Sequence, residues 1–196
     1  MGGPTESVAG TLPAEAPLAG AGPMVGVPEP CLVVLVGAAG SGKSTLAARL
    51  FAADQILSSD AFRGVLTGDE ANQTATRAAF AMLHRALDRR LGEGLTTVVD
   101  ATNVTSFARR SLVRRAEGHG VPAVALVLDL DPTLVLARNA TRAGRIVPAA
   151  AVQRQLDQLA RSLRRDELAK EGFAAIHLFR DPADVAGLTL VPRSPD

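Results

Sequence analysis

The chain has 196 residues, of which 47% are hydrophobic and 21% are charged. These values suit one domain with a packed core and exclude a wholly disordered chain. The formal net charge of +1 excludes a strongly basic nucleic-acid-binding protein, although a local basic patch is still allowed. The single cysteine, Cys31, excludes an internal disulfide framework, and three scattered histidines do not form a His/Cys zinc cluster.

Residues 1–30 differ in composition from the rest of the chain. They hold half of the twelve prolines and no Lys or Arg, and prolines at this density interrupt helices and interior strands. We therefore expect a disordered extension over residues 1–30 and one folded domain over residues 31–196. The extension lacks the basic start and unbroken apolar stretch of a signal peptide, and no apolar run could span a bilayer. The sequence thus predicts a soluble, cytoplasmic protein without a membrane partner.

From residue 31 onward, short apolar runs rich in β-branched residues alternate with helical patterns. Such runs are typical of strands that are buried on both faces. The predicted strands are residues 31–36, 55–58, 96–99, 123–128 and 176–179. Helical spacing of apolar residues, with glycine stops or proline starts, predicts helices at residues 80–91 and 106–117 and after residues 131 and 148. Strand and helix in alternation predict an α/β fold with a five-stranded parallel sheet flanked by helices.

The segment directly after the first predicted strand matches the P-loop pattern at every fixed position. It reads Gly-Ala-Ala-Gly-Ser-Gly-Lys-Ser from Gly37 to Ser44. Glycines let successive backbone N–H groups face phosphate oxygens, and the following helix adds its positive end. Lys43 would reach the β- and γ-phosphates, and the Ser44 hydroxyl would ligate Mg²⁺. We therefore expect a P-loop NTPase that binds ATP and Mg²⁺ through this segment and the next residue: Gly37, Ala38, Ala39, Gly40, Ser41, Gly42, Lys43, Ser44 and Thr45.

Two carboxylates follow other predicted strands. Because parallel strand ends collect at one edge of a sheet, Asp60 and Asp100 should face the same crevice as the P-loop. Asp60 could accept the proton of an attacking hydroxyl, with Arg63 on the same helical face, or it could simply cap a helix. Asp100, followed by Asn103, could hold Mg²⁺ through water or organise its loop by hydrogen bonds.

Three arginines form a third group of candidate site residues, after the P-loop and the two carboxylates. Offsets of four and seven residues place Arg138, Arg142 and Arg145 in one narrow stripe of a helix. Like charges in one stripe repel, so a multiply charged anion is a natural partner, although an arginine-rich composition could also produce the stripe by chance. Gly144 and Pro148 bracket a segment that could act as a closing lid and bring an arginine onto the transferred phosphoryl group.

This ordered set of motifs resembles the polynucleotide 5′-kinase family. The resemblance runs from about residue 32 to residue 181, and it is nearest to the kinase module of the bacterial polynucleotide kinase–phosphatase–ligase of RNA repair. It rests on five motifs: residues 37–45, 58–63, 72–74, 100–103 and 138–145. The resemblance implies transfer of the ATP γ-phosphate to the 5′-hydroxyl end of RNA or DNA, on a sheet whose central strand carries the P-loop.

The same resemblance assigns roles to individual residues. It makes Asp60 the general base, with Lys43 and Arg142 as the other catalytic residues. It assigns acceptor binding to Arg63, Gln73, Asp100 and Asn103. It assigns ATP binding to the lid arginines Arg138, Arg142 and Arg145.

One departure from the nearest relatives keeps other functions open. The relatives continue into phosphatase and ligase modules, which are not found in this sequence, so we expect any repair phosphatase and ligase to act in trans. A kinase on its own could also phosphorylate a sugar, nucleoside or antibiotic hydroxyl, or the chain could be a nucleotide-dependent switch without an acceptor. A guanidinium at Arg63, beside the attacking hydroxyl, favours an acceptor that carries a phosphodiester. The sequence does not indicate an oligomeric state or a preference for RNA or DNA.

Overall fold

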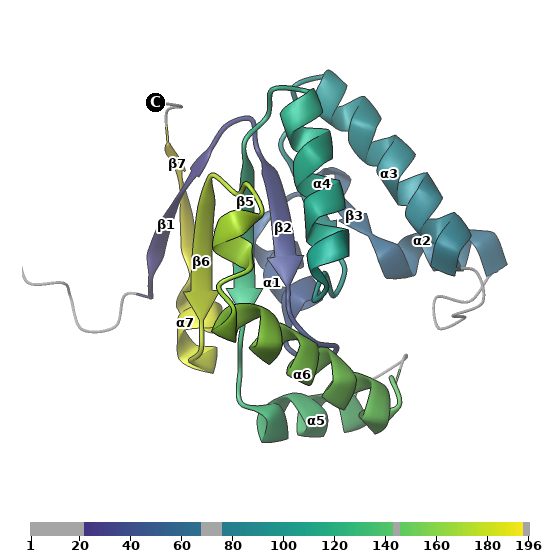
Figure 1. Ribbon diagram of the computed structural model, residues 1–196, viewed down its shortest axis with the longest axis vertical. Helices are drawn as coiled ribbons and strands as arrows, with labels where there is room; N and C mark the ends of the chain where they lie inside the picture. The colour runs from purple at the N-terminus through teal and green to yellow at the C-terminus, as the bar shows by residue number, and fades with distance from the viewer. Residues whose placement is uncertain (1–21, 68–75, 143–145, 194–196) are drawn as a thin grey trace, which may run out of the picture.

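The computed structural model describes residues 22–67, 76–142 and 146–193 (Figure 1). Strands and helices alternate along the chain, as the sequence predicts. The strands are β1 (Met24–Pro28), β2 (Leu32–Val36), β3 (Ile56–Ser58), β4 (Thr97–Asp100), β5 (Ala123–Leu128), β6 (Ala175–Phe179) and β7 (Thr189–Arg193). The helices are α1 (Lys43–Leu50), α2 (Ser59–Thr67), α3 (Thr76–Gly92), α4 (Ser106–Gly118), α5 (Pro132–Ala140), α6 (Ala149–Arg164) and α7 (Pro182–Gly187), with short 3₁₀ turns η1 (Ala53–Gln55) and η2 (Leu168–Lys170).

The main sheet has five parallel strands in the order β3-β4-β2-β5-β6. Strand β2 is central, and its first residue, Leu32, pairs in register with Thr97 of β4 and Ala123 of β5. The α/β fold class, the five-stranded parallel sheet and the central position of the P-loop strand are therefore confirmed. Every residue of β2 is buried, as its continuous apolar sequence predicts.

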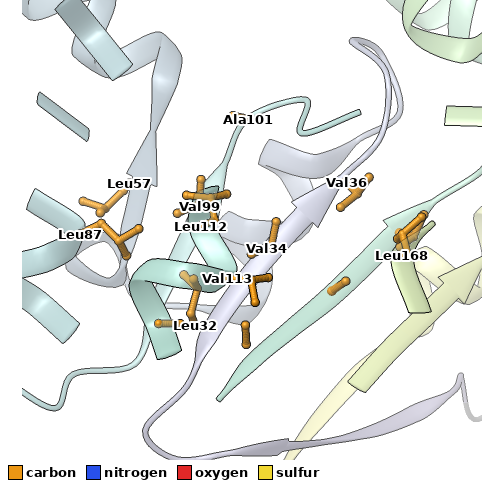
Figure 2. Close-up of a cluster of buried hydrophobic side chains, with 14 of the residues drawn as sticks. Leu32, Val34, Val36, Leu57, Leu87, Val99, Ala101, Leu112, Val113 and Leu168 are labelled. Atoms are coloured by element: carbon orange, nitrogen blue, oxygen red, sulfur yellow. The ribbon is translucent and has the colours of Figure 1, made fainter. Parts of the chain in front are cut away.

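Alternate residues of the strands build a core on each face of the sheet. Leu32, Val34 and Val36 of β2 pack with side chains of α3 and α4 (Figure 2). Leu159 of α6 belongs to the same buried cluster. Val33 and Leu35 point to the opposite face, where α1 and α7 cover them. The two helical layers leave the carboxyl ends of the strands open, and there the loops converge.

A second, two-stranded sheet corrects the expected boundary of the disordered extension. Strand β1 pairs in parallel with β7, in a register from Met24 with Thr189 to Pro28 with Arg193. Val25 and Val27 are buried in the same core cluster as Leu46 of α1. Alternating valines drive this strand, and its proline lies at the strand's end, where a missing N–H disturbs pairing least. The expectation of disorder was thus wrong for Met24–Pro28, while residues 1–21 lie outside the described residues.

The expected arginine stripe is also corrected, because α5 ends between its first two members. Thr141 leaves the helix, and its N–H donates to the carbonyl of Ala137. The Asn139 amide then donates to the Val147 carbonyl at 2.7 Å, while its oxygen accepts from the Val147 N–H at 3.2 Å. These bonds tie Val147, two residues before α6, to the last turn of α5. Arg138 therefore lies on the helix and Arg142 beyond it.

None of the helices within the described ranges is both long and apolar enough to cross a membrane.

Candidate phosphoryl-transfer site

A cavity of about 630 Å³ lies at the carboxyl edge of the main sheet. Its walls come from the P-loop, the first turns of α1 and α2, the end of β4, α5 with the residue Arg142, and parts of α6 and α7. The expected site residues Lys43, Asp60, Arg63 and Asp100 all line this one cavity. Segments far apart in the sequence thus meet where parallel strands end, as the topology requires.

The P-loop adopts a backbone that only glycine accommodates easily. Gly40 and Gly42 have φ angles of 88° and 96°, in the left-handed region. A side chain at Gly40 would also collide with the Val135 carbonyl of α5, whose oxygen would lie 2.5 Å from the added carbon. Gly42 has nothing within 4 Å of that position, so its backbone angle alone calls for glycine. Gly42 caps α1, whose first N–H groups are therefore open to an anion in the cavity.

Lys43 is held at the base of this cradle. Its ammonium donates to the Ala38 carbonyl at 2.8 Å and to the Ser41 hydroxyl at 3.3 Å. Burial lowers the pKa of Lys43 to about 8; Asp100 opposes the shift and Arg142 adds to it. The side chain is only 7% exposed. A buried cation beside open backbone donors suits a phosphate chain that has been stripped of water.

Asp60 and Arg63, which also line the cavity, form an ion pair. They lie three residues apart at the start of α2, and the guanidinium of Arg63 pairs with the carboxylate of Asp60. The hydroxyl of Ser59 also approaches Asp60, at 3.5 Å. Arg63 is 5% exposed, whereas the side chain of Asp60 is 27% exposed. The sequence analysis placed these residues on one helical face but did not predict the pair, although opposite charges three residues apart on a helix are close enough to form one.

The two residues expected after β4 separate in the structure. Asp100 lines the cavity and is mostly buried. Asn103 instead has a left-handed backbone (φ 47°), and its amide donates to the Leu35 carbonyl at 2.8 Å. Asn103 is not among the cavity-lining residues and ties its loop to the central strand, so the structure does not bring it to the expected substrate site.

A buried ion pair, which sequence reasoning missed, supports the same loop. Arg109 of α4 is fully buried and contacts Glu171 at 2.6 and 2.8 Å. The same guanidinium also donates hydrogen bonds to the carbonyls of Asn103 and Val104, at 3.2 and 2.9 Å. An arginine in a helical stretch with four arginines gave no local signal of burial. Only the apolar residues around it, with Glu171 before β6, could have suggested it.

Arg138 and Arg142 both line the cavity, although no single helix carries them. Arg145 and Gln73, which were expected to contact ATP and the acceptor, lie outside the described residues. The sequence analysis missed two polar side chains of the cavity that form hydrogen bonds with the backbone. Gln155 of α6 accepts a hydrogen bond from the Ala39 N–H at 2.8 Å, and Arg49 of α1 donates to the carbonyls of Val185 and Leu188.

No cluster of three or more His, Cys, Asp or Glu side chains that could hold a metal by itself occurs among residues 22–67, 76–142 and 146–193. The cavity does hold an oxygen pair, the Ser44 hydroxyl and the Asp100 carboxylate. These are suitable ligands for Mg²⁺ when phosphate oxygens and water complete its shell. The residues present therefore fit a nucleotide-bound magnesium ion and do not form a cage for a free one.

The glycine cradle, the central P-loop strand and the parallel sheet together define a kinase-like P-loop domain. A family model described as an AAA domain matches residues 32–165, about two thirds of the chain, and the chain belongs to this family. Such a fold suggests binding of ATP. No curated protein matches the sequence.

Solved structures show the same fold at low sequence identity. A chain of the Pnkp1/Rnl/Hen1 RNA repair complex aligns with a TM-score of 0.61 and 23% identity, over 71% of this chain and 47% of that one. A chain of the AvrRxo1-ORF1:-ORF2 complex with ATP aligns with a TM-score of 0.62 and 16% identity, over 78% of this chain and 55% of that one. A sugar kinase from Janibacter sp. HTCC2649 aligns with a TM-score of 0.54 and 23% identity, over 80% of this chain and 90% of that one. The chain thus spans about half the length of the first two structures, and these likenesses concern the fold.

Proposed function

We propose that this chain transfers the γ-phosphate of ATP to the 5′-hydroxyl end of RNA or DNA. The observation that supports the proposal is the shared cavity, which the Asp60–Arg63 pair and the P-loop lysine both line. A carboxylate there can take the proton of an attacking hydroxyl. A guanidinium beside it can bind the phosphodiester that follows a 5′-terminal nucleoside.

The transfer itself follows the common course of phosphoryl-transfer reactions. The 5′ oxygen loses its proton to Asp60 and forms a bond to the γ-phosphorus, while the bond from phosphorus to the β,γ-bridging oxygen breaks and ADP leaves with that electron pair. Lys43 and the first N–H groups of α1 hold the phosphates. Ser44 and Asp100 would hold Mg²⁺, which, when bound, neutralises charge on the β- and γ-oxygens. Arg138 and Arg142 offset charge near the transferred group.

A small-molecule hydroxyl is the second candidate acceptor. One observation favours it: the charge of Arg63 is already balanced by Asp60, and its side chain is 5% exposed. An acceptor phosphate would therefore have to compete with an existing ion pair. This chain resembles a sugar kinase from Janibacter in fold, and a sugar hydroxyl is therefore one alternative acceptor.

The test compares acceptors in one assay. The protein is incubated with γ-labelled ATP, Mg²⁺ and either a 5′-OH oligonucleotide, a nucleoside or a panel of sugars. The proposal expects label on the oligonucleotide, and label on a nucleoside or sugar alone would favour the second candidate. Label found only as free phosphate would contradict both and leave a nucleotide-dependent switch.

Arg63→Met sharpens the comparison. We expect it to raise the KM for a 5′-OH oligonucleotide by about tenfold or more, because a charge-assisted bond to a phosphodiester is lost, while the KM for ATP changes little. Arg89→Met, at an exposed position of α3, is the matched control. Equal effects of Arg63→Met on both substrates would count against the assignment of Arg63 to the acceptor.

A further inference from the structure

The N-terminal half of α6 is packed directly against the P-loop. Ala38 and Ala39 of the loop share a buried apolar cluster with Val135 of α5 and Val152 of α6. One turn after Val152, Gln155 reaches the loop, and its side-chain oxygen accepts a hydrogen bond from the Ala39 N–H at 2.8 Å. A helix that follows the arginine-bearing segment is thus bonded to the phosphate cradle.

This hydrogen bond fixes the orientation of the Gln155 amide. A backbone N–H can only donate, so the atom of Gln155 that faces Ala39 must be the oxygen. The NH₂ group therefore lies on the other branch of the same planar amide. Within the described part of the chain, that NH₂ group has no hydrogen-bond acceptor, and Gln155 lines the cavity. The result is a neutral donor, held in place by its own oxygen and open to a ligand.

The position of Lys43 indicates which part of a ligand this donor would meet. The Lys43 ammonium lies 2.8 Å from the carbonyl of Ala38, the residue next to Ala39. A P-loop lysine reaches the β- and γ-phosphates, whereas the β-phosphate itself lies over the first turn of the following helix. Ala38 and Ala39 are at the opposite end of the loop from that turn, so the outer end of a bound phosphate chain would lie beside Ala39, which lines the cavity.

We propose that Gln155 is a specificity-determining residue that recognises the γ-phosphate, with its oxygen held by Ala39 and its NH₂ group donating to a γ-phosphate oxygen. The inference rests on the proposed use of ATP and adds to it a means of distinguishing the triphosphate from the diphosphate product. ADP lacks the outer phosphate, so it cannot accept this hydrogen bond. Gln155 would thus favour binding of substrate over retention of product.

Two substitutions separate the two functions of the amide. Gln155→Glu keeps an oxygen that can accept from Ala39 but replaces the donor with a charged oxygen that repels phosphate. Gln155→Leu removes both groups at similar volume. Gln153→Leu, at an exposed position two residues earlier on α6, is the matched control, because it removes only a surface bond to Asp157.

The measurement is the dissociation constant of ATP and of ADP, each with Mg²⁺, by titration calorimetry. We expect Gln155→Glu to weaken ATP by about tenfold or more and ADP by less than about threefold, since a hydrogen bond to a charged group is lost only with ATP. Gln155→Leu should also weaken ATP by about tenfold and, because Ala39 loses its partner, should weaken ADP as well. Gln153→Leu should leave both constants unchanged, and melting temperatures identify any variant that fails to fold.

An equal loss of ATP and ADP affinity in both variants would overturn the inference, because Gln155 would then only shape the loop. Unchanged constants in both variants would overturn it too. If no acceptor is phosphorylated but Gln155→Glu still discriminates against ATP, the proposed transfer fails while the recognition of the γ-phosphate stands. If Gln155→Glu does not fold, the ratio of ATP to ADP affinity in Gln155→Leu decides, because a purely structural defect lowers both equally.

Discussion

The cavity residues that we assign to the nucleotide (the nucleotide end) and those that we assign to the acceptor (the acceptor end) are built in different ways. The nucleotide end is mostly backbone from one continuous segment between β2 and α1, and its shape follows from glycine angles and a buried strand. The proposed acceptor end is the Asp60–Arg63 pair of α2, which only the folded chain brings to the same cavity as the P-loop. Phosphate binding is therefore expected to be a local property of the sequence, whereas under our proposal the choice of acceptor depends on this ion pair.

The largest expected effect is at the acceptor end. We expect Asp60→Asn to lower phosphoryl transfer by about 10²–10⁴-fold, because the amide cannot take the proton of the attacking hydroxyl. Nucleotide affinity should stay near that of the wild type, because the P-loop does not depend on this carboxylate. The rate is measured under single-turnover conditions and the affinity by calorimetry.

Asp54→Asn is the control for Asp60→Asn, because Asp54 is exposed on the η1 turn just before β3. It should leave both the rate and the affinity unchanged. Loss of the folded state in Asp60→Asn would instead show that the carboxylate mainly stabilises α2 through Arg63. In that case Asp60 would not be the general base, and the proposed transfer would need another residue in that role.

The next effect concerns the buried pair that supports the loop after β4. Glu171→Ala leaves the buried Arg109 guanidinium with only the partly exposed carboxylate of Glu167, 3.8 Å away, and we expect the free energy of unfolding to fall by about 3 kcal/mol. Urea denaturation measures this loss. Replacing both partners, as Arg109→Met with Glu171→Leu, should cost much less, because no buried charge is left unpaired.

An exposed ion pair provides the control for Glu171→Ala. Arg180 contacts Asp129 at 3.1 Å, and its side chain is 69% exposed. Asp129→Ala should therefore change stability by less than about 1 kcal/mol. A double variant as unstable as Glu171→Ala would show that packing, and not the unpaired charge, accounts for the loss.

Much of the fold could be predicted because it depends on local patterns. All five strands of the main sheet lie within one residue of their predicted ranges at each end, since buried parallel strands are short and continuously apolar. The β1–β7 pair could not be predicted, because Val25 and Val27 are only two apolar residues among prolines and their partner strand is over 160 residues away. Proline frequency was a misleading signal there, because these prolines bracket the strand and do not interrupt it.

The candidate site was predictable in part for the same reason. The P-loop residues, Asp60, Arg63 and Asp100 follow from motifs at strand ends, and the structure brings them into one cavity. The prediction of one helical arginine stripe was wrong, because helical periodicity does not reveal where a helix ends. Helix α5 ends at Ala140, and Asn139 in its last turn binds Val147. Partners such as Gln155 and Ala39 are 116 residues apart, and no local pattern encodes a contact of that range.

The pH dependence of the nucleotide end tests the buried lysine. Burial lowers the pKa of Lys43 from 10.5 to about 8. Between these values the unfolded chain still binds the proton that the folded chain has lost, so stability without nucleotide should rise as the pH increases from about 8 to 10.5. ATP favours the charged ammonium, so ATP affinity should fall above pH 8, by up to about tenfold per pH unit.

Lys43→Met should abolish both trends, and Lys170→Met should preserve both, because Lys170 is the only other lysine and is exposed. Stability is followed by denaturation at each pH, and affinity by calorimetry in two buffers that differ in ionisation enthalpy. Proton uptake on ATP binding near pH 9 is the expected signature. Its absence would indicate that Lys43 keeps an ordinary pKa and that the cradle is more hydrated than its burial implies.

The smallest expected effect concerns how the second sheet supports the nucleotide end. Strand β7 follows α7, and Arg49 of α1 binds the carbonyls of Val185 and Leu188 at 2.9 and 2.8 Å, which ties this wall of the cavity to the P-loop helix. Val27→Ala in β1 should lower the free energy of unfolding by about 1–3 kcal/mol. It should raise the KM for ATP slightly without changing that of the acceptor, whereas Met24→Ala, at the exposed start of β1, should change neither. If Val27→Ala raised only the KM for the acceptor, β1 would support the acceptor end and not the nucleotide end.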